Sequence, residues 1–291
     1  MGSSAAANTL ATPLHTLLEH AVGLGISHFD ITPSTRDPQN TEAAIALALA
    51  PLLPRRDSLT FSARIGLGSY PQSLPGFGSR KRLLAGLDRL LLHTGLDYLD
   101  LLYAHRYDIR TPLEETTAAL ASAVQQGKVL YAGLSGYAPS KVRAAVHQFN
   151  RLGTPLVACQ ASYSLLDRWI EDGLLDLLGR LGIGCVAAAP LSHGALTHPP
   201  LPTLGQTPRL PDLLHIATGR RQSLPQLAVS WALRYPRITS ALITASRPHH
   251  LTETCAALDR LTFTSDELAA IDTCCPPPER RPSPAHVSTA P

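Results

Sequence analysis

Short apolar segments rich in β-branched and aromatic residues alternate with longer segments of helical periodicity along residues 14–259. The short segments predict seven strands, at residues 26–31, 59–65, 98–104, 129–135, 156–161, 185–189 and 240–244. The longer segments predict helices at residues 41–53, 79–94, 113–126, 139–151, 172–181, 226–234 and 247–259. Strands that alternate with helices indicate βαβ crossovers and a parallel sheet buried on both faces.

Seven such units predict an α/β fold, a (β/α)₈ TIM barrel that lacks its first strand. A doubly wound sheet is the alternative, but no G-x-G-x-x-G motif follows the first predicted strand. A helix at about residues 14–23 has no strand before it. Either a preceding segment is absent from this chain, or an irregular segment fills the gap.

The barrel domain is predicted to span residues 14–272, between two disordered ends. Residues 1–13 are small and polar and predict a disordered N-terminus. Residues 273–291 are rich in proline and predict a disordered tail, in which Cys274 and Cys275 have no assigned role.

Composition excludes several classes of protein. Hydrophobic residues make up 44% of the 291 positions, which excludes a disordered chain. Charged residues make up only 16%, the net charge is +3, and basic residues do not cluster, so a nucleic-acid partner is not expected. No apolar segment reaches the roughly 18 residues of a membrane span, and no secretory signal is visible. Five cysteines without zinc-site or disulfide spacing suggest no metal and a cytoplasmic location.

The carboxyl ends of the predicted strands carry seven motifs, and these ends are where barrel enzymes place their chemistry. The motifs are H-F-D ending at Asp30, S-A-R-I-G around Arg64, L-D-Y-L-D-L-L-Y-A-H-R ending at Arg106, G-L-S-G at 133–136, Q-A-S-Y-S-L-L-D-R at 160–168, A-P-L-S-H-G-A-L-T at 189–197 and A-S-R-P-H-H-L-T-E-T at 245–254. In this order they resemble the aldo/keto reductase family over residues 14–272. Residues 78–81 and 111–116 resemble its potassium-channel beta-subunit branch, and residues 162–168 with 173–176 are most similar to bacterial L-glyceraldehyde 3-phosphate reductases.

The resemblance implies an enzyme that reduces a small aldehyde or ketone by hydride transfer from NADPH. It implies four catalytic positions, an aspartate, a tyrosine, a lysine and a histidine. Asp30 matches the aspartate and His105 the histidine, but Thr35 stands at the tyrosine's position and Arg64 at the lysine's. The predicted catalytic residues are therefore Asp30, Thr35, Arg64 and His105.

The two replacements change the expected proton chemistry. A threonine hydroxyl is far less acidic than a phenol, whose pKa is about 10, so Thr35 cannot donate a proton near neutral pH. Arg64 can pair with Asp30, but a guanidinium does not release its proton either. His105 or a phenol placed elsewhere, at Tyr107 or Tyr70, is left as the acid. His28 lies two residues before Asp30 and is expected to fill the barrel.

The resemblance also assigns residues to NADP(H) at the ends of the last strands, where helix N-termini bind phosphate. Ser246 and Arg247 match positions at the 2′-phosphate, and an arginine there favours NADPH over NADH. The other assigned residues are Ser135 and Gln160 at the nicotinamide, Pro190, Leu191 and Gly194 at the pyrophosphate, and His250 and Glu253 on the last helix.

Several family positions near the cofactor differ in this chain. Ala188 replaces an aromatic residue, His198-Pro199-Pro200 replaces Gly-Lys-Tyr, and Thr254 replaces an asparagine. These losses leave NADP(H) retention open. Three functions therefore compete: a divergent reductase, a non-redox isomerase or lyase using His105 as base, and an inactive binding or regulatory protein. A homo-oligomer is also possible.

Overall fold

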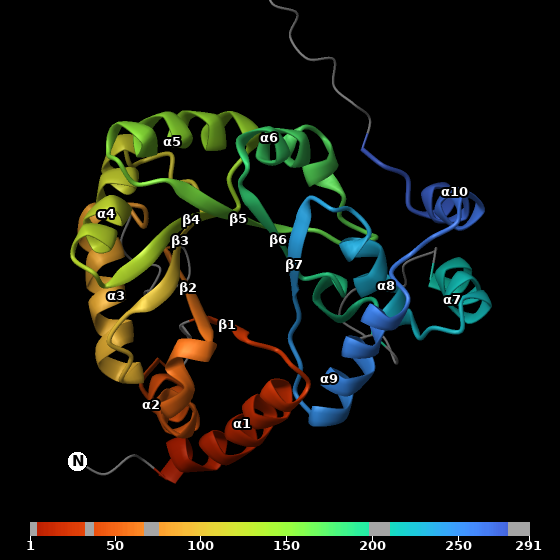
Figure 1. Cartoon of the computed structure of the whole chain (residues 1–291), viewed down its shortest axis with the longest axis horizontal. Coiled ribbons are helices and arrows are strands. Elements are labelled where there is room, and N and C mark those ends of the chain that lie inside the picture. The colour runs from red at the N-terminus through yellow and green to blue at the C-terminus, as the bar shows by residue number, and fades with distance from the viewer. Residues whose placement is uncertain (1–4, 33–37, 67–75, 198–209, 279–291) are drawn as a thin grey trace, which may run out of the picture.

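The computed structural model describes residues 5–32, 38–66, 76–197 and 210–278. Seven strands form one sheet in chain order, and all six neighbouring pairs are parallel. The strands are β1 (His28–Ile31), β2 (Thr60–Gly66), β3 (Leu99–His105), β4 (Val129–Ser135), β5 (Leu156–Ser162), β6 (Gly184–Ala188) and β7 (Ile238–Leu242). The sheet curls into a nearly closed barrel, so the predicted fold class is confirmed (Figure 1).

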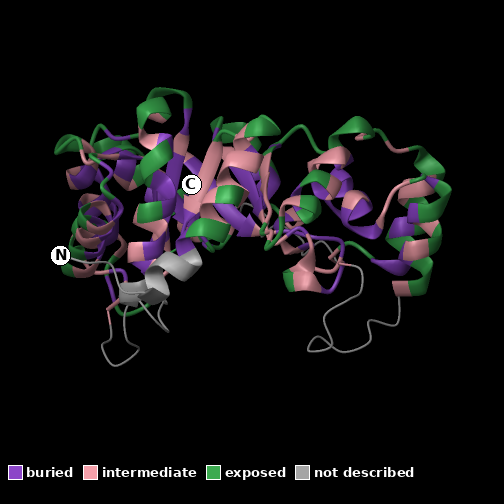
Figure 2. Cartoon of the chain, turned by 90° about the horizontal axis from the view of Figure 1, so that it is seen from below, coloured by how far each residue is buried: buried purple, intermediate pink, exposed green. Residues whose placement is uncertain are grey.

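Helices surround the strands on the outside of the barrel (Figure 1). The α-helices are α1 (Ala5–Gly23), α2 (Pro38–Leu49), α3 (Arg80–Thr94), α4 (Leu113–Gln125), α5 (Pro139–Arg151), α6 (Leu174–Leu181), α7 (Leu210–Gly219), α8 (Leu224–Leu233), α9 (Pro248–Cys255) and α10 (Ser265–Cys274). Short 3₁₀ helices are η1 (Ala50–Ser58), η2 (Trp169–Glu171), η3 (Ser192–Gly194) and η5 (Ala256–Asp259). The buried residues lie mainly between helices and strands (Figure 2). Side chains from α3, including Leu83 and Leu87, pack there against the sheet.

The barrel is open between β1 and β7, which are the two edge strands of the sheet. Outside this seam, α1 contacts both α2 and α9. A helix therefore covers the position at which the described residues supply no strand. The predicted absence of one strand is confirmed for this part of the chain.

The first helix begins earlier than the sequence pattern suggested. Helix α1 starts at Ala5 instead of about residue 14, and Pro13 lies inside it. Alanine has the highest intrinsic helix propensity, and residues 5–7 are all alanine. Ala11 is also buried. Residues 5–13 are thus helical, which differs from the disordered N-terminus expected up to residue 13.

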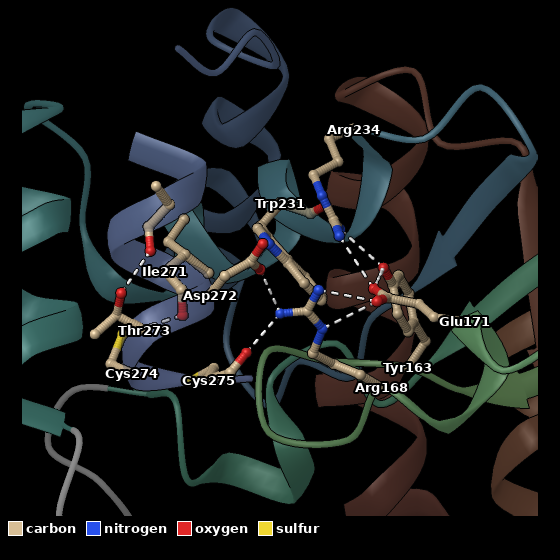
Figure 3. A network of polar contacts seen from close by, with 11 residues as sticks. Tyr163, Arg168, Glu171, Trp231, Arg234, Ile271, Asp272, Thr273, Cys274 and Cys275 are labelled. Atoms are coloured by element: carbon tan, nitrogen blue, oxygen red, sulfur yellow. Dashed lines mark hydrogen bonds and ion pairs between the residues drawn. The ribbon is translucent and has the colours of Figure 1, made fainter. Parts of the chain in front are cut away.

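The C-terminal end of the domain also differs from the prediction. Cys274 and Cys275 are buried, so the packed domain continues past residue 272. The Arg168 guanidinium donates to Asp272 Oδ1 at 2.7 Å and to the carbonyl of Cys275. The same guanidinium pairs with Glu171, which also pairs with Arg234 (Figure 3). This buried network attaches the end of α10 to the barrel.

Candidate active site

Asp30 and Arg64 form an ion pair at the carboxyl ends of β1 and β2. Arg64 Nε donates to Asp30 Oδ2 at 3.2 Å, and Arg64 Nη2 donates to Thr32 Oγ1 at 2.7 Å. Ser62 lies beside Asp30 in the ladder, and its hydroxyl donates to Asp30 Oδ1 at 2.6 Å. Only 3% of the Asp30 side chain is exposed, so these donors replace the water that a carboxylate otherwise binds.

His28 extends this polar chain deeper into the barrel. Its Nε2 atom lies 2.9 Å from Ser62 Oγ. Because the Ser62 hydrogen points to Asp30, His28 must be the donor in this contact. Burial lowers the pKa of His28 below its ordinary value, although Asp30 opposes the shift. The expectation that His28 fills the barrel is incomplete, because the ring also joins the Asp30 network.

His105, Ser135 and Gln160 form a row across the carboxyl ends of three consecutive strands, β3, β4 and β5. They are register partners in the two ladders. Ser135 Oγ donates to Gln160 Oε1 at 3.1 Å, and His105 Nδ1 lies 3.1 Å from Ser135 Oγ. Since the Ser135 hydrogen is directed to Gln160, His105 Nδ1 carries the proton and donates. The Nε2 atom of a neutral His105 therefore presents a lone pair.

Burial lowers the pKa of His105, and the positive charge of Arg64 lowers it further. A hydrogen bond to Ser135 and the charge of Asp30 partly oppose both effects. His105 is consequently neutral at pH 7. In this form it accepts a proton or a hydrogen bond at Nε2, and it donates there only after protonation.

Tyr103 is a buried phenol that the motif comparison missed. It precedes His105 by two residues on β3, and its hydroxyl has no hydrogen-bond partner among the described residues. Gly133 makes room for the ring, because a Cβ atom there would lie 2.5 Å from Tyr103 Cδ1. Burial raises the pKa of Tyr103, which makes it a poor acid. Strand alternation predicts that Tyr103 and His105 share a face, and this signal could have identified the residue.

Three further residues were discussed from the sequence in connection with the proton donor: Thr35, Tyr70 and Tyr107. Thr35 and Tyr70 lie outside the described residues. The Tyr107 ring packs edge-on against Tyr137, with centroids 5.8 Å apart, and Lys141 Nζ lies 4.5 Å from its centroid. These contacts hold the Tyr107 ring against α5 and its preceding loop.

The residues assigned to the pyrophosphate follow β6 in a tightly turned segment. Two of them, Pro190 and Leu191, lie between β6 and η3, and Gly194 is the last residue of η3. Ala189, Ser192 and His193 in this segment have positive φ angles of 50°, 48° and 55°. Such conformations are costly for residues other than glycine and cluster at ligand sites.

The residues assigned to the 2′-phosphate lie at the N-terminus of α9, after β7. Ser246 and Arg247 are exposed, and Arg247 is the N-cap residue without a side-chain capping bond. Arg247 forms no ion pair with any residue in the described segments. His250 and Glu253 lie on the same helix, His250 being exposed and Glu253 partly buried. The free amides and the guanidinium at this helix end suit a phosphate group.

The structure thus brings the predicted residues into two separate hydrogen-bonded groups. Arg64 bonds to Asp30 in the first group. In the second group, Ser135 bonds to both His105 and Gln160. The residues after β6 and β7 lie at the same carboxyl end of the barrel as these two groups. Gln160 is a buried residue, and its Nε2 atom forms no hydrogen bond within the described part of the chain, so this nitrogen can donate to a ligand carboxamide. These features fit a nicotinamide cofactor. No group of three metal-ligating side chains occurs within residues the structure describes, and no helix there is long and apolar enough to cross a membrane.

Similarity to known proteins identifies the family of this chain. A family model described as "Aldo/keto reductase family" matches residues 3–275. The chain is 40% identical to L-glyceraldehyde 3-phosphate reductase of Escherichia coli strain K12, over 88% of this chain and 82% of that protein. It is 39% identical to the protein of the same description from strain O157:H7, with the same coverage. The chain belongs to the aldo/keto reductase family.

Proposed function

We propose that this oxidoreductase reduces a small aldehyde or ketone with NADPH, and that its proton donor differs from the tyrosine implied by the family resemblance. The observation that carries this proposal is the row of His105, Ser135 and Gln160 beside the Asp30–Arg64 pair. The row offers a ring nitrogen and an amide side by side at the end of the barrel where such enzymes react.

In this proposal the chain binds the two ends of the cofactor separately. Gln160 Nε2 and Ser135 orient the nicotinamide carboxamide, and Arg247 with Ser246 pairs with the 2′-phosphate. Pro190, Leu191 and Gly194 bring backbone groups to the pyrophosphate. His250 and Glu253 border the adenine. When bound, NADPH supplies the hydride for the carbonyl carbon.

His105 supplies the proton in this account. In the imidazolium form its Nε2–H donates to the carbonyl oxygen, while Nδ1–H remains bonded to Ser135. Arg64 stays charged and stabilises the negative charge that develops on that oxygen. Because burial and Arg64 lower the pKa of His105, little imidazolium is present at pH 7. Carbonyl reduction is therefore expected to be slow at neutral pH.

The names of the relatives suggest which substrates to test. The E. coli relatives are named for reduction of L-glyceraldehyde 3-phosphate, so this aldehyde and unphosphorylated glyceraldehyde and methylglyoxal form the test panel. Cys159, Cys185 and Cys255 are free thiols, which supports a cytoplasmic location.

Two measurements test the proposal. Fluorescence titration should show saturable NADPH binding, and binding of NADH should be weaker. NADPH oxidation should then depend on an aldehyde from the panel. If neither NADPH nor NADH binds, the proposal is wrong.

A second candidate is a non-redox isomerase or lyase that uses His105 as a base. The neutral ring with a lone pair at Nε2 favours it. The pH dependence separates the two functions, because a base loses activity when the pH falls, whereas an imidazolium donor gains it.

A further inference from the structure

The loop after β5 folds back over the carboxyl end of its own strand. Ser164 and Asp167 exchange two backbone hydrogen bonds, of 2.9 and 3.2 Å, and so form a tight turn. Ser164 Oγ also accepts from the amides of Leu166 at 3.2 Å and of Asp167 at 3.1 Å. The turn therefore returns the chain toward Ser162, the last residue of β5.

Ser162 fixes one edge of the Trp169 indole at this end of the barrel. Trp169 Nε1 donates to Ser162 Oγ at 3.1 Å, and Ser162 Oγ donates to Asp167 Oδ2 at 2.6 Å. Ser162 follows Gln160 by two residues, so both side chains lie on the same face of β5. Two residues advance a strand by about 6.6 Å. The Nε1 edge of the indole thus lies one layer of side chains beyond the Gln160 amide, toward the open end of the barrel.

The cofactor of the proposed function has to cross this layer. In that proposal its carboxamide binds Gln160 on β5, and its pyrophosphate binds the segment with Pro190 and Gly194 after β6. Ala188 is the last residue of β6 and the register partner of Ser162. A nicotinamide riboside that joins the two positions therefore passes over the Ser162–Ala188 pair.

The two sides of this layer differ in the surface that they offer to a flat ring. Ala188 offers only a methyl group. The Trp169 side chain is partly buried, so part of its aromatic surface remains accessible. An indole stacks on flat rings, and it attracts a positively charged group more strongly than a neutral one. The nicotinamide ring is positively charged in NADP⁺ and uncharged in NADPH, so a stack on Trp169 favours the oxidised cofactor.

We propose that Trp169 is a cofactor-binding residue whose indole stacks on the nicotinamide ring and supplies the aromatic contact that Ala188 lacks. This inference rests on the proposed function, because it takes Gln160 and the segment after β6 as the positions that bind the cofactor. The bond to Ser162 orients the indole before the cofactor binds. Little side-chain entropy is then lost when the two rings stack.

The chain has two tryptophans, which makes fluorescence a direct test. NADP⁺ does not absorb light where tryptophan emits, so it quenches an indole only on contact. Titration with NADP⁺ should quench part of the emission. The fragment 2′-phospho-ADP-ribose, which lacks the nicotinamide, should bind without quenching. Calorimetry measures the binding of both ligands independently of the emission.

Two variants assign the quenched signal to one tryptophan. Trp169→Phe should abolish the quenching, because the remaining Trp231 is fully buried on α8. Trp231→Phe should keep the quenching and is the matched control. If Trp231→Phe fails to fold, the loss of quenching in Trp169→Phe decides the assignment.

The affinity of a third variant separates stacking from a structural role. Trp169→Leu should weaken the binding of NADP⁺ about tenfold and that of NADPH less, because it removes the aromatic surface. Its affinity for 2′-phospho-ADP-ribose should change by no more than about twofold. Trp169→Phe keeps an aromatic ring and should weaken NADP⁺ binding less than Trp169→Leu.

Two results would overturn the role of Trp169 and leave the proposed function intact. One is binding of NADP⁺ in the calorimeter without quenching of Trp169. The other is an equal loss of affinity for NADP⁺ and 2′-phospho-ADP-ribose in Trp169→Leu, which would show that Trp169 only holds the loop after β5. If calorimetry detects binding of neither NADP⁺ nor NADPH, the proposed function fails and this inference fails with it.

Discussion

Arg64 Nε donates to Asp30 Oδ2 at 3.2 Å and thereby compensates a carboxylate that is almost fully buried. The Arg64 side chain is itself partly exposed, 24% of its surface, so the pair lies at the border between the barrel interior and the open end. This position lets one guanidinium stabilise Asp30 and also act on a ligand above it.

Replacing Arg64 with methionine should destabilise the fold. Asp30 would keep its bond from Ser62 but lose its charged donor. A hydrogen bond to a charged group contributes about 1.5–3 kcal/mol, so the free energy of unfolding should fall by about that amount. Urea denaturation measures it. Arg64→Lys preserves the charge and should cost clearly less, and equal losses for both variants would refute a charge-based role.

The pH dependence of aldehyde reduction should reveal the state of His105. Its pKa is lowered, so the imidazolium donor is scarce at pH 7 and becomes more abundant as the pH falls below the ordinary value of about 6.5. The value of kcat/KM should therefore rise with acid, and His105→Gln should remove this rise. A rate that falls with acid would support the isomerase or lyase candidate.

The lowered pKa values of two partly buried histidines also make the fold less stable in acid, so the measurement of rate against pH needs a folding control. His28 and His105 both have lowered pKa values in the folded state. The unfolded chain then binds protons near pH 6.5 before the folded chain does, and stability falls as the pH drops through that range. Circular dichroism at each pH identifies the range in which the rates report on folded protein.

The sequence predicted the helix–strand alternation well, because buried parallel strands are nearly continuous apolar segments. It did not predict the ends of the domain. The first helix was predicted to start at about residue 14, whereas α1 begins at Ala5. The prolines after Cys275 obscured the fact that Cys274 and Cys275 are buried. Arg168 bonds to the Cys275 carbonyl across 107 residues, and no local pattern reveals such a contact.

The candidate site was predictable only in part. Strand alternation and motif order place Asp30, Arg64 and His105 at one end of the barrel. They do not show that Ser62 links His28 to Asp30, or that Ser135 fixes the proton of His105 on Nδ1. The Ser62 link and the Ser135 bond both depend on which residues lie opposite each other on neighbouring strands. This register is a property of the folded sheet.

Arg247→Ala should weaken the binding of NADPH far more than that of NADH. The variant removes the charge proposed to pair with the 2′-phosphate, a contact of about 1.5–3 kcal/mol, which corresponds to a loss of roughly tenfold or more. Fluorescence titration with both nucleotides measures it. The same loss for NADH would show that Arg247 does not recognise the 2′-phosphate.

Arg168→Met should loosen the C-terminal helix. Arg168 is buried and bonds to Glu171, Asp272 and Cys275, so its loss leaves the buried Glu171 carboxylate with Arg234 and the Tyr163 hydroxyl as partners (Figure 3). Loss of a hydrogen bond to a charged group costs about 1.5–3 kcal/mol. Asp272 is half exposed, so Asp272→Asn should cost less than about 1 kcal/mol. Thermal unfolding of both variants, with hydrogen exchange in α10, tests the difference.

We propose that the site retains carbonyl reduction and lacks an efficient proton donor. The most direct test is the rate of L-glyceraldehyde 3-phosphate reduction by the Thr35→Tyr/Arg64→Lys double variant with saturating NADPH. A phenol beside an ammonium has a lowered pKa, and general-acid catalysis typically contributes 10²–10⁴-fold. We expect the rate to rise by about that factor at pH 7, with little change for Arg64→Lys alone. No rise in a double variant that binds NADPH would contradict it.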